Sequence, residues 1–113
     1  MKYRWAVAIV LVSIIFLGAA AVQNKGAAQI TIEAGERGAV PFPHHLHQDK
    51  LGDCNICHSY FPQEARAIEL LKENGKLVRK EVMNKLCVKC HKAEKRAGNK
   101  AGPVTCSKCH HKG

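Results

Sequence analysis

Three copies of one short motif constrain this chain more than any other feature. The pattern Cys-x-x-Cys-His occurs at residues 54–58, 87–91 and 106–110. All six cysteines of the sequence belong to these copies, so none is left for another purpose. Disulfides need no histidine, and zinc sites do not need one directly after the second cysteine of a pair. The usual roles of paired cysteines therefore leave the repeated histidine unexplained.

Covalent attachment of a c-type haem explains all three residues of the motif. The two thiols form thioether bonds with the haem vinyl groups, and the imidazole of the next residue binds the iron. We therefore predict three covalently bound haem c groups, with three disulfides or zinc as the alternatives. The predicted attachment residues are Cys54, Cys57, Cys87, Cys90, Cys106 and Cys109, and the predicted proximal ligands are His58, His91 and His110.

The haems also compensate for a shortage of core-forming side chains. The chain has 113 residues, of which only 5% are aromatic. A chain this short buries a small share of its surface and usually needs disulfides, metals or another internal scaffold. Three rigid, apolar haems provide that scaffold, with roughly 30 residues of protein around each one.

The N-terminus has the features of an export signal. Basic residues at positions 2 and 4 precede an apolar run from residue 6, and three alanines at residues 19–21 form a cleavage site. We expect residues 1–21 to be a signal peptide or an N-terminal membrane anchor. The anchor is the alternative because the run over residues 6–22, about 17 residues long, is close to the length that spans a bilayer. In either case the remainder of the chain is expected to be periplasmic, with residues 22–28 as a linker.

A short β-hairpin is expected at the start of the exported part. Residues 29–33 alternate polar and apolar side chains, as a half-buried strand does. Residues 35–38 contain two glycines and form a turn, and residues 39–42 return as the second strand.

Helices are expected further along the chain. Residues 62–74 have a proline at the start, strong helix formers inside and Gly75 after the end, which is the pattern of a helix with both ends marked. Shorter helical turns are expected at residues 78–86 and 90–97, followed by a loop at residues 98–103.

These features together resemble the triheme cytochrome c7 family, the small relatives of tetrahaem cytochrome c3. The resemblance rests on the hairpin, on the segment Phe-Pro-His-His-Leu-His at residues 42–47, and on the three closely spaced motifs, and it covers roughly residues 27–113. It implies a triheme domain over residues 29–113 with a small multihaem cytochrome c3/c7-like fold. That fold has little regular structure, namely a short N-terminal β-hairpin and a few short α-helices wrapped around three covalently bound haems.

The resemblance also implies two of the distal iron ligands. Three irons have six axial positions, of which the histidines of the motifs fill three. In cytochromes c7 the first histidine after Phe-Pro binds the first haem, and the histidine three residues later binds the next haem along the chain. Here these are His44 and His47. A spacing of three places both on one side of a helical turn, whereas the alternative is that both are surface histidines.

The third distal ligand departs from the family pattern. Bis-histidine members have a histidine four residues before the second motif, and this chain has Met83 there. A thioether is a known axial ligand that raises the reduction potential, so we expect two bis-histidine haems of low potential and one His/Met haem of higher potential. His111 and His45 are the competing ligands, although both are expected to be solvated, and Met83 as a core filler is the other alternative.

The charge of the chain is strongly basic. Eighteen Lys and Arg residues oppose nine Asp and Glu residues, and residues 85–113 contain eight basic residues and a single acid, Glu94. This excess either pairs with haem propionates and favours solubility, or forms a docking face for acidic redox partners. Nucleic acid is excluded as a partner by the expected compartment.

The predicted coordination determines the predicted function. An iron with both axial positions filled by protein has no open site for substrate, so it exchanges electrons without bond chemistry. We expect a periplasmic electron carrier of anaerobic respiration and not an enzyme. The expected donors are quinol-oxidising membrane cytochromes, and the expected acceptors are terminal or outer-membrane cytochromes. The alternatives are a membrane-anchored subunit of a respiratory complex, or a haem enzyme with an open third haem if Met83 does not bind.

Overall fold

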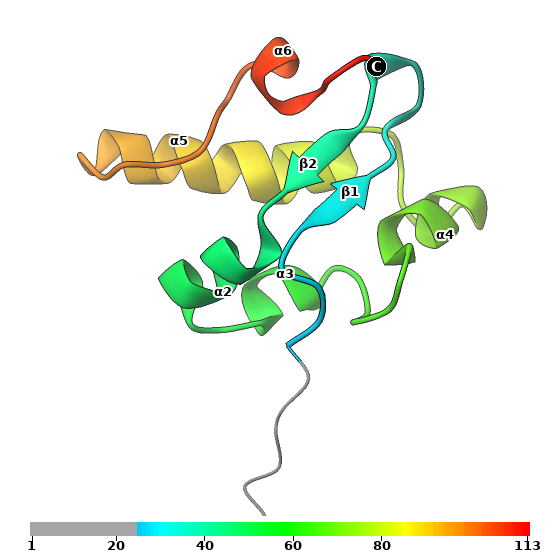
Figure 1. Ribbon diagram of the computed structural model, residues 1–113, viewed down its shortest axis with the longest axis horizontal. Helices are drawn as coiled ribbons and strands as arrows, with labels where there is room; N and C mark the ends of the chain where they lie inside the picture. Colours follow the sequence, from blue (N-terminus) through cyan, green and yellow to red (C-terminus); the bar gives the residue numbers. More distant parts are fainter. Residues whose placement is uncertain (1–24) are drawn as a thin grey trace, which may run out of the picture.

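The computed structural model describes residues 25–113 (Figure 1). The predicted signal peptide or anchor at residues 1–21, and the first part of the linker at residues 22–28, lie outside this range. Within residues 25–113, no helix is both long enough and apolar enough to cross a membrane.

The expected β-hairpin is present. Strand β1 (Ile30–Ile32) pairs antiparallel with β2 (Val40–Phe42), so that Ile30 lies opposite Phe42. A single 3-10 turn, η1 (Gly35–Arg37), connects the strands at the expected position. The hairpin leads directly into the histidine-rich segment and therefore fixes where that segment begins.

The C-terminal residues close onto the hairpin. The backbone N–H of His111 donates to the carbonyl of Ala39 over 2.9 Å, and the two residues form an isolated antiparallel bridge. Gly38 has φ +92°, and a side chain there would overlap the carbonyl of His111. Glycine is therefore required at this position both for its conformation and for the space it leaves. The bridge brings the third motif beside the first two strands (Figure 1).

Three short helices carry the histidine segment and the outer two motifs. Helix α2 (His44–Leu51) follows β2 immediately and ends at Gly52, which has the left-handed φ of 68°. Helices α3 (Asn55–His58) and α6 (Cys106–Cys109) each form one turn within the first and third motifs.

The helix expected at residues 62–74 is shorter than predicted. Helix α4 (Ala67–Glu73) ends just before Gly75, as expected, but its start at Pro62 was wrong. Arg66, immediately before the helix, has the left-handed φ of 58°, which breaks the helical path. Its guanidinium pairs with the carboxylates of Glu69 and Glu73 one and two turns ahead, and these ion pairs accompany the unusual backbone.

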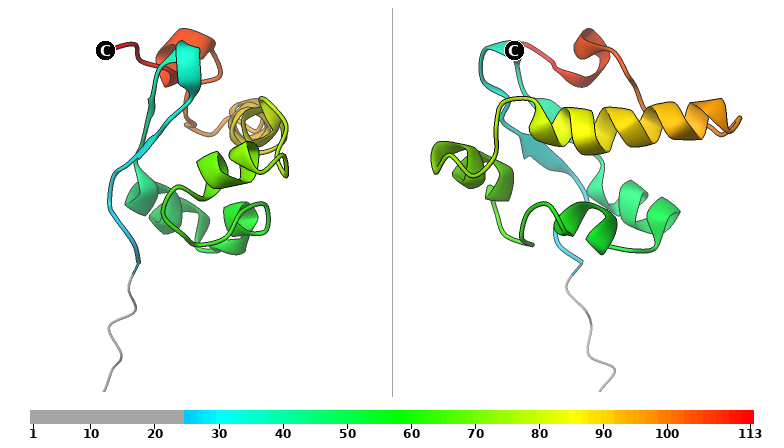
Figure 2. Two further views of the ribbon diagram at one scale, coloured as in Figure 1. Left: turned by 90° about the vertical axis from the view of Figure 1, so that its right-hand side faces the viewer. Right: turned by 180° about the vertical axis from the view of Figure 1, so that it is seen from behind.

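The two short helices expected at residues 78–86 and 90–97 form one continuous helix instead. It begins at Glu81, passes through a π-helical segment, η2 (Met83–Cys87), and continues as α5 (Val88–Arg96). Figure 2 shows it as a single straight rod. A π segment widens one turn and is common at functional sites. Here it contains Met83 and the first cysteine of the second motif.

The helices lie on three levels with very little protein core between them. In Figures 1 and 2, α5 lies between α6 on one side and the α2–α3 pair on the other. Among the described residues, Ala67 is the only buried hydrophobic side chain, while Leu46 and Val78 are largely exposed. The polypeptide therefore forms a shell, as expected for a fold whose interior consists of haem.

Candidate haem sites

Helical geometry turns each motif into one attachment surface. Within one turn of helix, the two cysteines and the histidine occupy positions i, i+3 and i+4, which lie on the same side. The N–H of His58 donates to Cys54 O, and the N–H of His110 donates to Cys106 O, each over 2.9 Å. In all three copies the first cysteine is exposed and the second is half-buried. Both sulfurs can therefore reach one edge of a haem while the imidazole reaches the iron of the same haem.

The three attachment surfaces lie close to one another. Burial raises the pKa of the Cys57 thiol, and the nearby thiols of Cys90 and Cys54 raise it further. Electrostatic interactions of this kind act over a few ångströms. The first motif lies next to the second, because His44 and His47, one turn apart, face His58 and His91. The second motif lies next to the third, because Val88 lines a hollow together with Cys106 and Cys109.

The structure places His44 opposite His58 and His47 opposite His91. The ring centroids are 6.3 Å apart in the first pair, with the planes at 79°, and 6.2 Å apart in the second, with the planes at 35°. Two metal–nitrogen bonds of about 2.0 Å, plus the radii of the two rings, separate such centroids by about 6.2 Å. Each pair therefore has the spacing that a single iron between two imidazoles requires.

The hydrogen bonds of the same histidines select one ring nitrogen. In five of the seven histidines Nδ1 faces a backbone carbonyl, so Nδ1 carries the proton and Nε2 is free to bind a metal. Orientation of a ligating imidazole by a backbone carbonyl is usual at metal sites. The five bonds join His44 to Ala27 (2.9 Å), His47 to Pro43 (2.9 Å), His58 to Phe61 (3.2 Å), His91 to Pro103 (2.7 Å) and His110 to Gly38 (3.1 Å).

The other two histidines behave differently. The ring of His45 donates through Nε2, to the carbonyl of Gly26 over 3.0 Å, so its metal-binding nitrogen is already occupied. His45 was expected to be solvated; its side chain is partly exposed, and its ring is hydrogen-bonded to the backbone of Gly26. His111 is exposed, as expected.

Met83 lies beside the third motif. It lines a hollow of about 210 Å³ together with Cys106, Cys109 and His110, between the π segment and α6. Val88 and Val104 also line the hollow and make part of it apolar. Neither His45 nor His111 is among the described residues that line it.

Comparisons with known proteins identify the family of this chain. The sequence model of the family described as cytochrome c7 and related cytochrome c matches residues 40–111. The chain belongs to the cytochrome c7 family. It is 31% identical over 84 residues to a cytochrome c7 from Geobacter metallireducens, covering 74% of this chain and 76% of that protein.

Solved cytochromes c7 have the same fold. The structure of PpcC from Geobacter sulfurreducens, at 33% identity, covers 77% of this chain and all of its own with a TM-score of 0.53. The triheme cytochrome PpcA from the same organism, at 30% identity, covers 76% of this chain and all of its own with a TM-score of 0.54. This cytochrome c7 therefore binds three covalently attached haem c groups, and the donor sets described above fit them.

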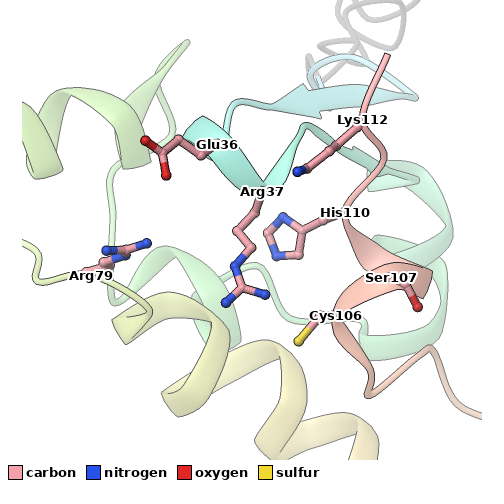
Figure 3. Close-up of a pocket in the computed structure, with 7 residues that line it drawn as sticks. All are labelled: Glu36, Arg37, Arg79, Cys106, Ser107, His110 and Lys112. Carbon is pink, nitrogen blue, oxygen red and sulfur yellow. The ribbon is translucent and has the colours of Figure 1, made fainter.

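A second hollow beside the third motif is lined by more basic than acidic side chains, with one acid, Glu36, among them. It has a volume of about 440 Å³ and adjoins Cys106 and His110. Figure 3 shows the guanidinium of Arg37 extending past His110 toward Cys106, while Arg79 and Lys112 approach from either side. The basic residues of the sequence were noted at residues 85–113, but Arg37 and Arg79 come from earlier segments. No local sequence signal places these two cations at the third haem.

Proposed function

We propose that this cytochrome c7 is a periplasmic electron carrier of anaerobic respiration in which every iron has two protein ligands. His44 and His58 bind the first iron, His47 and His91 the second. One observation carries this proposal. The four rings form two pairs at iron-bridging distance, and each ring presents Nε2 because a carbonyl holds Nδ1. A fully ligated iron exchanges electrons with its surroundings and leaves no position for substrate, so the protein is a carrier and not an enzyme.

The hydrogen bonds from Nδ1 have an electronic effect as well as an orienting one. A carbonyl that accepts the Nδ1 proton makes the imidazole a stronger electron donor to the metal. Stronger donation favours the oxidised iron, so two such ligands lower the reduction potential. The first and second haems are therefore the low-potential pair. His44 and His47 lie one turn apart on α2, which holds these two haems close enough for electrons to pass between them.

The third iron is proposed to bind His110 and Met83. The π segment widens the helix at Met83, and this residue shares a hollow with the third motif. A thioether ligand raises the reduction potential relative to a second imidazole. The nearby cations Arg37, Arg79 and Lys112 act in the same direction, because positive charge favours the less positive, reduced iron. The third haem would therefore receive electrons from the other two.

The proposed Met83 ligand is tested by two substitutions. The oxidised wild-type protein should show a methionine-to-iron charge-transfer band in the near infrared. Met83→Leu should lose the band and, when reduced, bind carbon monoxide at one haem in three. Met83→His should also lose the band but bind no carbon monoxide, and its third potential should fall, because a second imidazole replaces the thioether.

The outcomes separate the alternatives. A wild-type protein without the band would refute Met83 as ligand and redirect attention to His111, whose replacement by alanine would then open one haem. Stoichiometric carbon monoxide binding by the reduced wild-type protein would refute the carrier and support a haem enzyme with an open third site.

The proposed partners are quinol-oxidising membrane cytochromes as donors and terminal or outer-membrane cytochromes as acceptors. The cations near the second and third motifs would meet acidic groups on these proteins. If so, the second-order rate of electron exchange with an acidic cytochrome should fall as ionic strength rises. A rate that does not depend on salt would refute this docking mode. Mass spectrometry of the protein from a periplasmic fraction would show whether residues 1–21 are removed.

A further inference from the structure

Residues 25–28 form an N-terminal strap that lies against the start of α2. Four consecutive backbone carbonyls of the strap accept hydrogen bonds, and every donor lies in residues 44–48. The donors are Gln48 Nε2 to Lys25 O (2.7 Å), His45 Nε2 to Gly26 O (3.0 Å), His44 Nδ1 to Ala27 O (2.9 Å) and His45 N to Ala28 O (3.2 Å). Residues 25–28 of the predicted linker are therefore attached to α2, the helix that carries the two proposed iron ligands His44 and His47.

The strap also packs directly on the ring of His44. Gly26 has φ +72°, and a Cβ at this position would lie 3.3 Å from Cε1 and 3.5 Å from Nδ1 of that ring. The strap backbone therefore contacts the imidazole, and the next carbonyl, that of Ala27, takes its proton. The position of the strap thus determines both the tautomer and the plane of His44.

Two residues of α2 that bind no iron hold the strap in place. His45 uses its ring and its backbone N–H, and Gln48 uses its side-chain amide. Adjacent positions on a helix point about 100° apart, so His45 cannot share the face of His44 and instead reaches the strap. Among the seven histidines of the chain, it is the one whose Nε2 is bonded to a carbonyl.

We propose that His45 is a positioning residue for the first haem. It holds the strap against α2, and the strap in turn orients His44 toward the iron through the carbonyl of Ala27. This inference depends on the proposed role of His44 as distal ligand. Loss of a partner that orients a metal ligand typically weakens the metal–ligand interaction 10- to 100-fold. Replacement of His45 should therefore loosen the distal bond of one haem without removing either of its ligands.

The test uses His45→Leu, which removes the ring donor, and His45→Gln, whose amide can still donate to Gly26 O. Two quantities are measured on the holoprotein after its three haems have been counted. The first is the rate of tryptic cleavage after Lys25, which reports whether the strap is attached. The second is the rate at which cyanide displaces the distal ligand of the oxidised haems. His45→Leu should raise both rates, the second by about tenfold at one haem.

Matched variants make this result specific. His45→Gln should keep both rates near those of the wild type. Asp49→Leu, an exposed position on the same helix, should change neither rate. Gln48→Leu removes the bond to Lys25 without touching a histidine, so it tests the strap even if His45→Leu fails to retain its haems.

The possible failures are distinguishable. Unchanged cleavage after Lys25 in both His45→Leu and Gln48→Leu would refute the role of these residues in holding the strap. Faster cleavage with unchanged cyanide binding would refute the positioning of His44 by the strap. His44→Ala serves as the separate test of ligation. If it binds cyanide no faster than the wild type, then His44 is not a distal ligand and the proposed function is wrong.

Discussion

The contact between Gly102 and the ring of His91 gives a sharp test of how the second haem is held. A Cβ at Gly102 would overlap Cε1 of this ring and lie 2.7 Å from its Nε2 and 2.9 Å from its Nδ1. Ordinary contact begins at about 3.4 Å, so in Gly102→Ala the methyl group and Nε2 must separate by about 0.7 Å, and we expect the ring to move. Metal–ligand bonds tolerate changes of about 0.2 Å. The added methyl group is therefore incompatible with the position of the proximal ligand.

The cost of Gly102→Ala has two parts. Forcing a methyl group into filled space typically costs about 1–3 kcal/mol. Displacing the ring also weakens the bond from Nδ1 to Pro103 O, now 2.7 Å, and such a bond is worth about 0.5–1.5 kcal/mol. We expect the free energy of unfolding of the holoprotein to fall by about 1.5–4.5 kcal/mol. One haem in three should also show a high-spin signal in electron paramagnetic resonance.

The assay is guanidinium unfolding followed by Soret absorbance, together with the low-temperature resonance spectrum. Gly113→Ala is the control, because a Cβ there meets no atom within 4 Å, and it should leave both measurements unchanged. A Gly102→Ala protein with wild-type stability and three low-spin haems would refute the reasoning. It would mean that the backbone at Gly102 moves away from His91 at little cost.

Three further predictions concern the scaffold and its charges. Replacement of all six cysteines by serine should leave a chain with little helical circular dichroism, because Ala67 is the only buried hydrophobic side chain among the described residues. A haem-free variant that still folds would contradict this. Arg37→Gln should lower the reduction potential of the third haem by an amount on the order of tens of millivolts in a spectroelectrochemical titration. An unchanged potential would mean that this cation lies too far from the iron to affect it. Hydrogen bonds from Lys85 and then from the N–H of Val78 lower the pKa of Glu81. The resulting stabilisation of the folded protein is present above the ordinary carboxyl pKa and is lost as pH falls through the lowered pKa. Glu81→Gln should therefore reduce the urea midpoint at neutral pH but not in acid. Equal effects at both pH values would show that the ionised carboxylate of Glu81 is not the cause.

The parts of the fold that follow from local pattern were predictable. The hairpin, the end of α4 at Gly75 and the shared face of His44 and His47 depend on residues close together in the sequence. The start of α4 was not predictable, because Arg66 adopts a left-handed conformation alongside ion pairs to Glu69 and Glu73. Helix propensity does not distinguish the π segment from α-helix, since the same residues suit both.

The interactions that orient His44 and His110 depend on tertiary structure, whereas His47 and His58 are oriented by carbonyls only four and three residues away. The carbonyl that holds His44 is 17 residues away in sequence, and the carbonyl that holds His110 is 72 residues away. Backbone carbonyls have no residue type, so no motif marks them. The proposed role of His45 was not predictable from the sequence either, because a count of iron ligands says nothing about a histidine that binds the backbone.

The near absence of buried side chains in residues 25–113 has a consequence for how much of this protein a cell can hold. A polypeptide that forms only a shell cannot reach a protease-resistant state until its cofactors are attached, and chains that stay unfolded are removed. The amount of mature cytochrome then follows haem delivery more closely than it follows synthesis of the chain. We therefore expect the level of mature cytochrome to fall when haem supply falls, even at a constant rate of synthesis, because copies without haem are degraded.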